Sequence, residues 1–210
     1  MVTFFTVLKY GEFPHTRNDY TPAHVYSLKK QIEKYYTKPH RFICFTDHTN
    51  LECETIKLLH DWPGWWAKIE MFQFPAKKVF YFDLDTVILN NIDNIVDHEH
   101  DFTALKEALP NRITDNLGSG IMSWSGDKSF IYENFKADSK NIMCRLTRGD
   151  QVFIQEQIRA FDAFQNIDKN IYSYKFTLQD KQCPPTDAKI IYFSGKPKPW
   201  QVDYDWIPEY

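Results

Sequence analysis

Short runs of β-branched and aromatic residues alternate with longer amphipathic segments along the first part of the chain. Residues 3–8 and 41–45 are apolar runs of strand length, each followed by polar residues. The segment between them, from Pro22 to about residue 36, carries its apolar residues at helical spacing, and proline suits the first turn of a helix. This order of strand, helix and strand predicts a parallel sheet with crossover helices.

Shorter apolar runs continue this pattern to the end of the chain. Further strands are predicted over residues 78–82, 102–105, 121–124 and 189–193. Helices are predicted over residues 65–72, in two polar pieces between residues 128 and 146, and from Asp150 with a face made by Ile154, Ile158 and Phe161. Because no repeat, low-complexity tract or linker divides the sequence, we expect one α/β domain over residues 1–210, with a mainly parallel central sheet flanked by helices.

Composition and charge narrow the possible partners. The 210 residues are 43% hydrophobic and 17% aromatic, which is enough for a substantial core. A net charge of −3 without a basic cluster argues against a nucleic-acid partner. No signal peptide or membrane-spanning run is found, and the four cysteines lack metal-ligand spacing, so we expect a reduced, cytoplasmic protein. A monomer is expected, and the chain can also be one domain of a longer protein.

Two aspartates, Asp83 and Asp85, follow the apolar strand predicted over residues 78–82. In open parallel sheets, ligands bind at the carboxyl ends of the strands. Side chains two residues apart lie on the same side of a strand, so the two carboxylates converge if the strand continues or if a turn folds them together. Carboxylates this close repel each other and are costly to bury unless a cation neutralises them. A hard divalent cation such as Mn²⁺ or Mg²⁺ fits this role and recruits phosphate oxygens as further ligands.

Three other interpretations of this pair remain open. The carboxylates can be solvated turn residues. Residues 83–87 also match the Asp-x-Asp-x-Thr/Val sequence of haloacid-dehalogenase-like phosphatases, in which Asp83 would be the nucleophile. That motif usually lies on the opening strand, however, and its acidic partner motif is missing because Ile154 stands at the required place after Gly149 and Asp150. The third interpretation is a non-catalytic protein that binds a sugar nucleotide or a glycan.

Several segments, in the right order, resemble glycosyltransferases of the GT-A fold, and family 8 in particular, the group of glycogenin and bacterial galactosyltransferases. Residues 82–89 resemble its Asp-Ala-Asp-Thr-Leu-Val-Leu sequence, and residues 66–69 resemble its lysine segment. Residues 117–122 are similar to its Asn-Ser-Gly-Val segment, and residues 149–151 to its Asp-Gln motif. The most specific similarity is between residues 193–200, Phe-Ser-Gly-Lys-Pro-Lys-Pro-Trp, and the family's His-Phe-x-Gly-x-x-Lys-Pro-Trp.

The resemblance implies a role for each matching residue. Asp83 and Asp85 would hold Mn²⁺ or Mg²⁺ against the diphosphate of a sugar nucleotide. Asp150 and Gln151 would lie beside the reacting carbon as the catalytic residues. The donor contacts are implied for Lys68, Asp83, Ser119, Gly195 and Lys198. The nucleotide base is expected at the end of the first strand, with Tyr20 stacking on it, near Leu8, Lys9 and Tyr10.

Two residues depart from the family pattern. The family's metal-binding histidine is replaced by Tyr192, whose neutral phenol is a poor ligand for a hard cation. The metal would then be held by two protein carboxylates together with diphosphate and water. The asparagine of the Asn-Ser-Gly segment is replaced by Gly118, which removes an amide contact to the sugar. Both changes imply a different donor preference or a weaker metal site.

The implied activity is metal-dependent transfer of a sugar from a UDP-sugar to a glycan or another hydroxyl acceptor, with retention of the anomeric configuration. UDP-glucose is the default donor, with galactose, xylose or rhamnose as alternative sugars. The compact chain without a signal suits a bacterial, phage or large-virus enzyme of polysaccharide biosynthesis that decorates a surface glycan. The nucleotide would bind in about residues 1–90 and the acceptor in about residues 91–210. A glycosidase would need two carboxyls that flank the bond, and Asp83 and Asp85 are too close in sequence to form such a pair.

Overall fold

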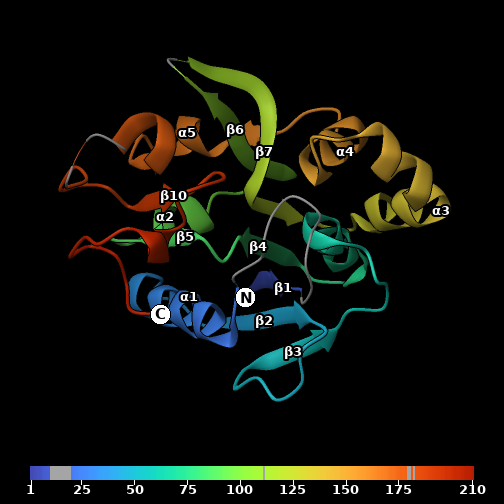
Figure 1. Cartoon of the computed structure of the whole chain (residues 1–210), viewed down its shortest axis with the longest axis horizontal. Helices are drawn as coiled ribbons and strands as arrows, with labels where there is room; N and C mark the ends of the chain where they lie inside the picture. Colours follow the sequence, from blue (N-terminus) through green and yellow to red (C-terminus); the bar gives the residue numbers. More distant parts are fainter. Residues whose placement is uncertain (10–19, 111, 179–180, 182) are drawn as a thin grey trace.

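The structure is a computed structural model that describes residues 1–9, 20–110, 112–178, 181 and 183–210. Its central feature is a seven-stranded sheet in the order β3-β2-β1-β4-β7-β6-β8 (Figure 1). The strands are β1 (Val2–Leu8), β2 (His40–Thr46), β3 (Glu54–Lys57), β4 (Lys78–Phe82), β6 (Phe102–Leu109), β7 (Arg112–Ser125) and β8 (Asp162–Ala163). Of these seven strands, only β7 runs antiparallel to its neighbours, so the prediction of a mainly parallel α/β sheet is confirmed.

A second sheet has three strands, with β10 between β5 and β9. Its strands are β5 (Thr86–Ile88), β9 (Ile171–Ser173) and β10 (Ile190–Tyr192). β10 pairs with β5 antiparallel and with β9 parallel. Because only residues 83–85 separate β4 from β5, this pairing brings the C-terminal part of the chain to the end of β4.

Helices cover both faces of the central sheet (Figure 1). One face packs against α1 (Pro22–Tyr35), α2 (Asp93–Val96) and α5 (Phe164–Ile167). The other packs against the 3₁₀ helix η1 (Gly64–Gln73), α3 (Ser129–Arg145) and α4 (Asp150–Gln157). Two short helical turns near the C-terminus are η2 (Tyr174–Leu178) and η3 (Pro199–Gln201). Among the described helices, none has both the length and the apolar composition that crossing a bilayer requires.

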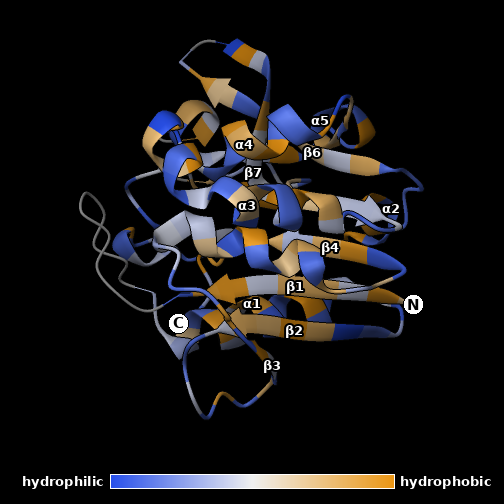
Figure 2. Cartoon of the chain, turned by 90° about the vertical axis from the view of Figure 1, so that its right-hand side faces the viewer, coloured by the Kyte–Doolittle hydropathy of each residue, from blue (hydrophilic) through white to orange (hydrophobic). Residues whose placement is uncertain are grey.

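The central strands are apolar on both faces. Successive residues of a strand point to opposite sides, so Phe4 of β1 packs with α1 and Phe5 packs with η1. Figure 2 shows β1, β2 and β4 as largely hydrophobic bands. Continuous apolar runs of this kind are typical of parallel strands covered on both faces, which is why these strands were recognisable in the sequence.

Most predicted elements are present with shifted ends. β4 occupies the predicted residues 78–82, and α1 ends one residue earlier than predicted. The backbone of Asp138 is non-helical (φ −145°) inside α3, which agrees with two predicted polar pieces. The predicted face of the following helix is wrong, because α4 ends at Gln157 and Ile158 already has an extended backbone.

The hairpin of β6 and β7 is longer than the pattern predicted. The outer residues of both strands are mostly half-buried or exposed, and many are polar, so they carry no strong hydrophobic pattern. β4 pairs with residues 121–125 of β7, and the first half of β7 pairs with β6. The outer hairpin is therefore a two-stranded ribbon that extends from the sheet (Figure 1).

Candidate active site

A tight turn follows β4 and carries Asp83 and Asp85. The backbone N–H of Thr86 donates to the carbonyl of Asp83 at 3.1 Å, and the N–H of Asp83 donates to the carbonyl of Gly120 on β7 at 2.8 Å. β4 has already ended at Phe82. The turn, rather than the alternation of a strand, therefore sets the positions of the two carboxylates.

A pocket of about 560 Å³ opens at the carboxyl ends of β1 and β4, the edge at which parallel sheets bind ligands. The side chain of Leu8 is buried in the core and does not line it, and Tyr10 lies outside the described residues. The predicted site residues that line the pocket are Lys9, Tyr20, Lys68, Asp83, Asp85, Ser119, Asp150, Gln151, Gly195 and Lys198.

Lys68 on η1 joins Asp83 to Asp150 at one side of the pocket. Its ammonium nitrogen lies 3.0 Å from Asp83 Oδ1 and 3.2 Å from Asp150 Oδ2. It also lies 3.2 Å from both the carbonyl oxygen and the hydroxyl oxygen of Ser119. The Tyr81 hydroxyl donates to the same oxygen of Asp83. We call these five residues the Lys68 cluster.

Burial and charge act on the Lys68 cluster in opposite directions. Burial raises the pKa of Asp83, and the Lys68 ammonium opposes it without cancelling it. Burial likewise raises the pKa of Asp150 against the effect of Lys68. Burial would lower the pKa of Lys68, but the carboxylates of Asp150 and Asp83 outweigh it and raise that pKa. One ammonium thus faces two carboxyl groups, and an excess of negative charge there can attract a further cation.

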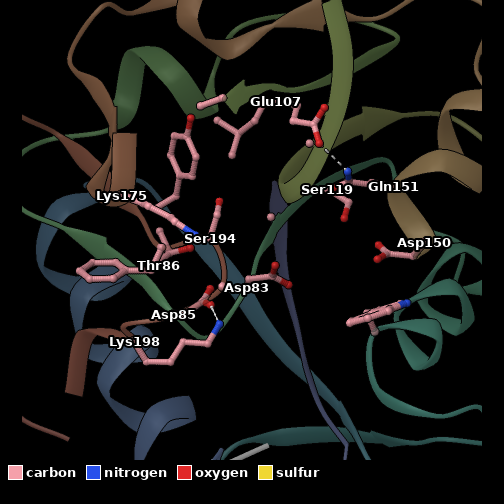
Figure 3. A pocket seen from close by; sticks show the side chains of 18 of the residues that line it. Asp83, Asp85, Thr86, Glu107, Ser119, Asp150, Gln151, Lys175, Ser194 and Lys198 are labelled. Carbon is pink, nitrogen blue, oxygen red and sulfur yellow. Dashed lines mark hydrogen bonds and ion pairs between the residues drawn. The ribbon is translucent and has the colours of Figure 1, made fainter. Parts of the chain in front are cut away.

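Asp85 is held by a different group of residues. The Tyr20 hydroxyl donates to Asp85 Oδ2 at 3.0 Å. The Lys198 ammonium donates to the same oxygen, as Figure 3 shows. The side chain of Asp85 is 6% exposed and that of Lys198 is 22% exposed. We call these three residues the Lys198 cluster. Because Tyr20 is bonded to a carboxylate here, its stacking on a nucleotide base stays a prediction.

The C-terminal segment that carries Lys198 is anchored by its backbone and by Trp200. Gly195 has φ of +74°, which favours glycine, and a Cβ there would meet no atom within 4 Å. The N–H of Lys198 donates to the side chain of Gln201 at 2.9 Å, and the ring of Trp200 lies 4.0 Å from that of His24 on α1. The segment is therefore fixed to α1, and the Lys198 side chain extends from it to Asp85.

Gly149 sets the start of α4, whose first turn carries Asp150 and Gln151. Its φ of +89° favours glycine. A Cβ at this position would lie 2.6 Å from the ring nitrogen of Trp65, so there is also no space for a side chain on residue 149. The first turn of α4 is thereby held against Trp65, another residue of the pocket.

Glu107 on β6 is a pocket residue that the sequence patterns did not indicate. It accepts hydrogen bonds from Arg148, from Asn116 at 3.1 Å and from the amide nitrogen of Gln151 at 3.1 Å (Figure 3). Burial would raise the pKa of Glu107, but these hydrogen bonds outweigh it and lower the pKa. An ionised carboxylate only accepts hydrogen bonds, so Gln151 presents its NH₂ group to Glu107 and its carbonyl oxygen elsewhere.

The turn offers two oxygen ligands for a divalent cation. Asp83 Oδ2 and Asp85 Oδ1 accept no hydrogen bond from the described residues, whereas the other oxygen of each carboxylate does. Among the residues that the structure describes, no third histidine, cysteine, aspartate or glutamate joins these two to complete a metal site. The polar neighbours of the Tyr192 hydroxyl are Ser173 and Gln165. Two carboxylates fit a hard cation that takes its remaining ligands from phosphate and water.

Comparison with known proteins identifies the fold. No family model matches the sequence, and no curated protein matches it. The structure is similar to that of the glycosyltransferase GlyE of Streptococcus pneumoniae TIGR4, with a TM-score of 0.66 and 10% identity over 96% of this chain and 56% of GlyE. For the galactosyltransferase LgtC, solved with donor and acceptor sugar analogues, the TM-score is 0.65 at 12% identity over 96% of this chain and 90% of LgtC.

A third similar structure is that of the bifunctional glycosyltransferase WbbM, with a TM-score of 0.63 and 14% identity over 98% of this chain and 48% of WbbM. This chain thus spans about half the length of the GlyE and WbbM chains. It has the GT-A fold of these glycosyltransferases, which confirms the fold implied by the sequence resemblance.

Proposed function

We propose that this chain, which shares its fold with known glycosyltransferases, is a metal-dependent glycosyltransferase that moves a sugar from a UDP-sugar to a hydroxyl group of a glycan. A fold alone does not determine an activity, so the proposal depends on the site. The observation that carries it is the turn with Asp83 and Asp85, which shares one pocket with Lys198 at the carboxyl ends of β1 and β4.

Asp83 Oδ2 and Asp85 Oδ1 are the atoms that would hold Mn²⁺ or Mg²⁺. When bound, such a cation neutralises the diphosphate as it becomes the leaving group. Lys198 would bind the same phosphates, and the backbone around Gly195 would approach them closely because no side chain intervenes. Positive charge aimed at the oxygens on which negative charge develops lowers the barrier to breaking the sugar–phosphate bond.

Asp150 and Gln151 would lie beside the anomeric carbon of the donor. The carbonyl oxygen of Gln151 points away from Glu107 and can stabilise positive charge that develops on the sugar ring. Lys68 and Ser119 hold Asp150 in place. Because an amide is a weak nucleophile, we favour a front-face displacement, in which the departing phosphate helps to remove the acceptor proton and the configuration is retained.

The nucleotide would bind within about residues 1–90, with its base at the end of β1. Lys9 borders the pocket there, and its ammonium is paired with Asp47 at 2.6 Å and Asp61 at 2.9 Å. The acceptor would enter from the side of residues 91–210. UDP-glucose is the default donor and polysaccharide synthesis the default process, carried out by a cytoplasmic monomer.

A panel of UDP-sugars tests this function. We expect one of them to raise the thermal unfolding temperature in the presence of Mn²⁺, to release UDP on incubation, and to lose both effects when EDTA removes the metal. Release of phosphate from small phosphomonoesters would contradict the proposal and favour a phosphatase. Stabilisation without turnover across a panel of sugar acceptors would instead indicate a binding protein.

A further inference from the structure

The Lys198 cluster brings an ammonium group to the carboxylate that the proposed function assigns to a divalent cation. Lys198 donates to Asp85 Oδ2 (Figure 3), and Tyr20 donates to the same oxygen. The Asp85 side chain is only 6% exposed, so its charge is poorly solvated and needs a positive partner. In the structure Lys198 is that partner.

The Lys198 side chain can change partners without moving the backbone. Its segment is anchored through Gln201 and Trp200, whereas its side chain is 22% exposed and is paired with one carboxylate. A lysine carries a compact charge on a flexible four-carbon stem. Lys68 lacks this freedom because its ammonium is buried and shared between Asp83 and Asp150.

We propose, on the basis of the function above, that Lys198 is an internal competitor of the divalent cation at Asp85. Without a nucleotide, Lys198 neutralises Asp85, and the turn binds a divalent cation weakly. A nucleoside diphosphate offers Lys198 a new anionic partner, so the lysine leaves Asp85, and the cation binds there together with the diphosphate. The cation and the nucleotide therefore bind cooperatively, each raising the affinity of the site for the other.

Two physical arguments support this exchange. An ammonium on Asp85 Oδ2 and a divalent cation on Asp85 Oδ1 would repel each other, so the ion pair with Lys198 lowers the affinity of this carboxylate for the cation. When a binding-competent state is only partly populated, the apparent affinity falls by that fraction, and here the competent state is the one with Asp85 released. A diphosphate carries more negative charge than a carboxylate and is thus the stronger partner for a lysine.

The experiment measures Mn²⁺ binding to the full chain from the spin-resonance signal of free Mn²⁺, with and without UDP. The proteins are wild type, Lys198→Met and, as a matched control, Lys196→Met, which removes a charge from the same segment of the pocket. We expect Lys198→Met to bind Mn²⁺ alone about tenfold more tightly than wild type, the factor by which an occupied Asp85 lowers the affinity. Lys196→Met should bind it as wild type does. Lys198→Met should also bind UDP with Mn²⁺ more weakly.

Tyr20→Phe is a second variant that keeps the ring and removes one of the two donors to Asp85. We expect it to bind Mn²⁺ alone about twofold more tightly, and Lys198→Gln, which also removes the ammonium, replaces Lys198→Met if that variant does not fold. Unchanged or weaker Mn²⁺ binding by the folded variants would overturn the inference, and the proposed function would stand if UDP still binds with Mn²⁺. If wild type binds Mn²⁺ neither alone nor with UDP, the metal-dependent function and the inference both fail.

Discussion

The Lys68 cluster and the Lys198 cluster each pair a lysine with an aspartate of the same turn, yet they are built differently. Lys68 comes from a helix in the hydrophobic core, has a 6% exposed side chain and contacts two carboxylates. Lys198 comes from an irregular segment, has a 22% exposed side chain and contacts one. The difference indicates that the first lysine maintains the shape of the site, whereas the second can respond to a ligand.

Removing either carboxylate tests whether the two clusters serve one reaction. Asp83→Asn and Asp85→Asn preserve the shape of the side chain and remove a metal ligand, so we expect sugar transfer to fall by about a thousandfold in both. Mn²⁺-dependent binding of UDP, measured by calorimetry, should be lost as well. Asp187→Asn, at an exposed position, is the matched control. Full transfer activity in either variant would rule out the metal assignment.

Removing each lysine tests the difference in burial directly. Lys68→Met leaves the buried Asp150 and the partly exposed Asp83 without their partner, so we expect the free energy of unfolding to fall by about 3–5 kcal/mol. Lys198→Met should lower it less, by about 1–2 kcal/mol, because Lys198 is more exposed than Lys68 and the buried Asp85 keeps its hydrogen bond from Tyr20. Urea unfolding measures both values. Equal losses would show that the two clusters do not differ as described.

Two glycines offer the same comparison at the level of the backbone. Gly149 precedes Asp150 and Gly195 precedes Lys198, and both have a positive φ. Gly195→Ala should cost about 1 kcal/mol of unfolding free energy through backbone strain alone. Gly149→Ala should cost about 2–3 kcal/mol, because its Cβ would also overlap the ring of Trp65. Thermal unfolding of the two variants gives the difference, and a smaller loss at Gly149 would contradict the packing described.

Glu107 tests the catalytic side of the site. If Glu107 orients the Gln151 amide, Glu107→Ala should lower kcat about tenfold, which is about 1.4 kcal/mol. KM for the donor and the affinity for UDP with Mn²⁺ should change little, since Glu107 is remote from the phosphates in this assignment. Arg148→Ala, which removes one donor to Glu107 but leaves Gln151 bonded to it, is the comparison variant. A purely structural role would lower stability and leave kcat unchanged.

The features that could be predicted from the sequence are those that a short stretch of residues determines by itself. β4 was predicted at its observed bounds because a strand buried on both faces has a continuous apolar run. The location of Asp83 and Asp85 in a pocket followed from the general rule for the ends of parallel strands.

The contacts between distant segments were not predictable in this way. Tyr20 meets Asp85 because residues far apart in the chain converge on one turn, and periodicity carries no information on such meetings. Glu107 lies on the outer ribbon, where successive residues of β6 are all half-buried and so lack the apolar alternation that marks a strand. The sharing of Lys68 between two carboxyl groups depends on the start of α4 and on η1 together.

The unequal lengths of β4 and β7 make the pocket more flexible toward a ligand on one side than on the other. Residues 121–125 of β7 are paired with β4, whereas residues 112–117 lie in the two-stranded ribbon with β6. Isolated ribbons are marginally stable, so the amides of residues 112–116 should exchange with deuterium far sooner than those of residues 121–125. Glu107 and Leu109 belong to that ribbon and line the pocket. The pocket is therefore rigid at Asp83 and flexible along the ribbon. Ligands of different size can enter it without displacing Asp83.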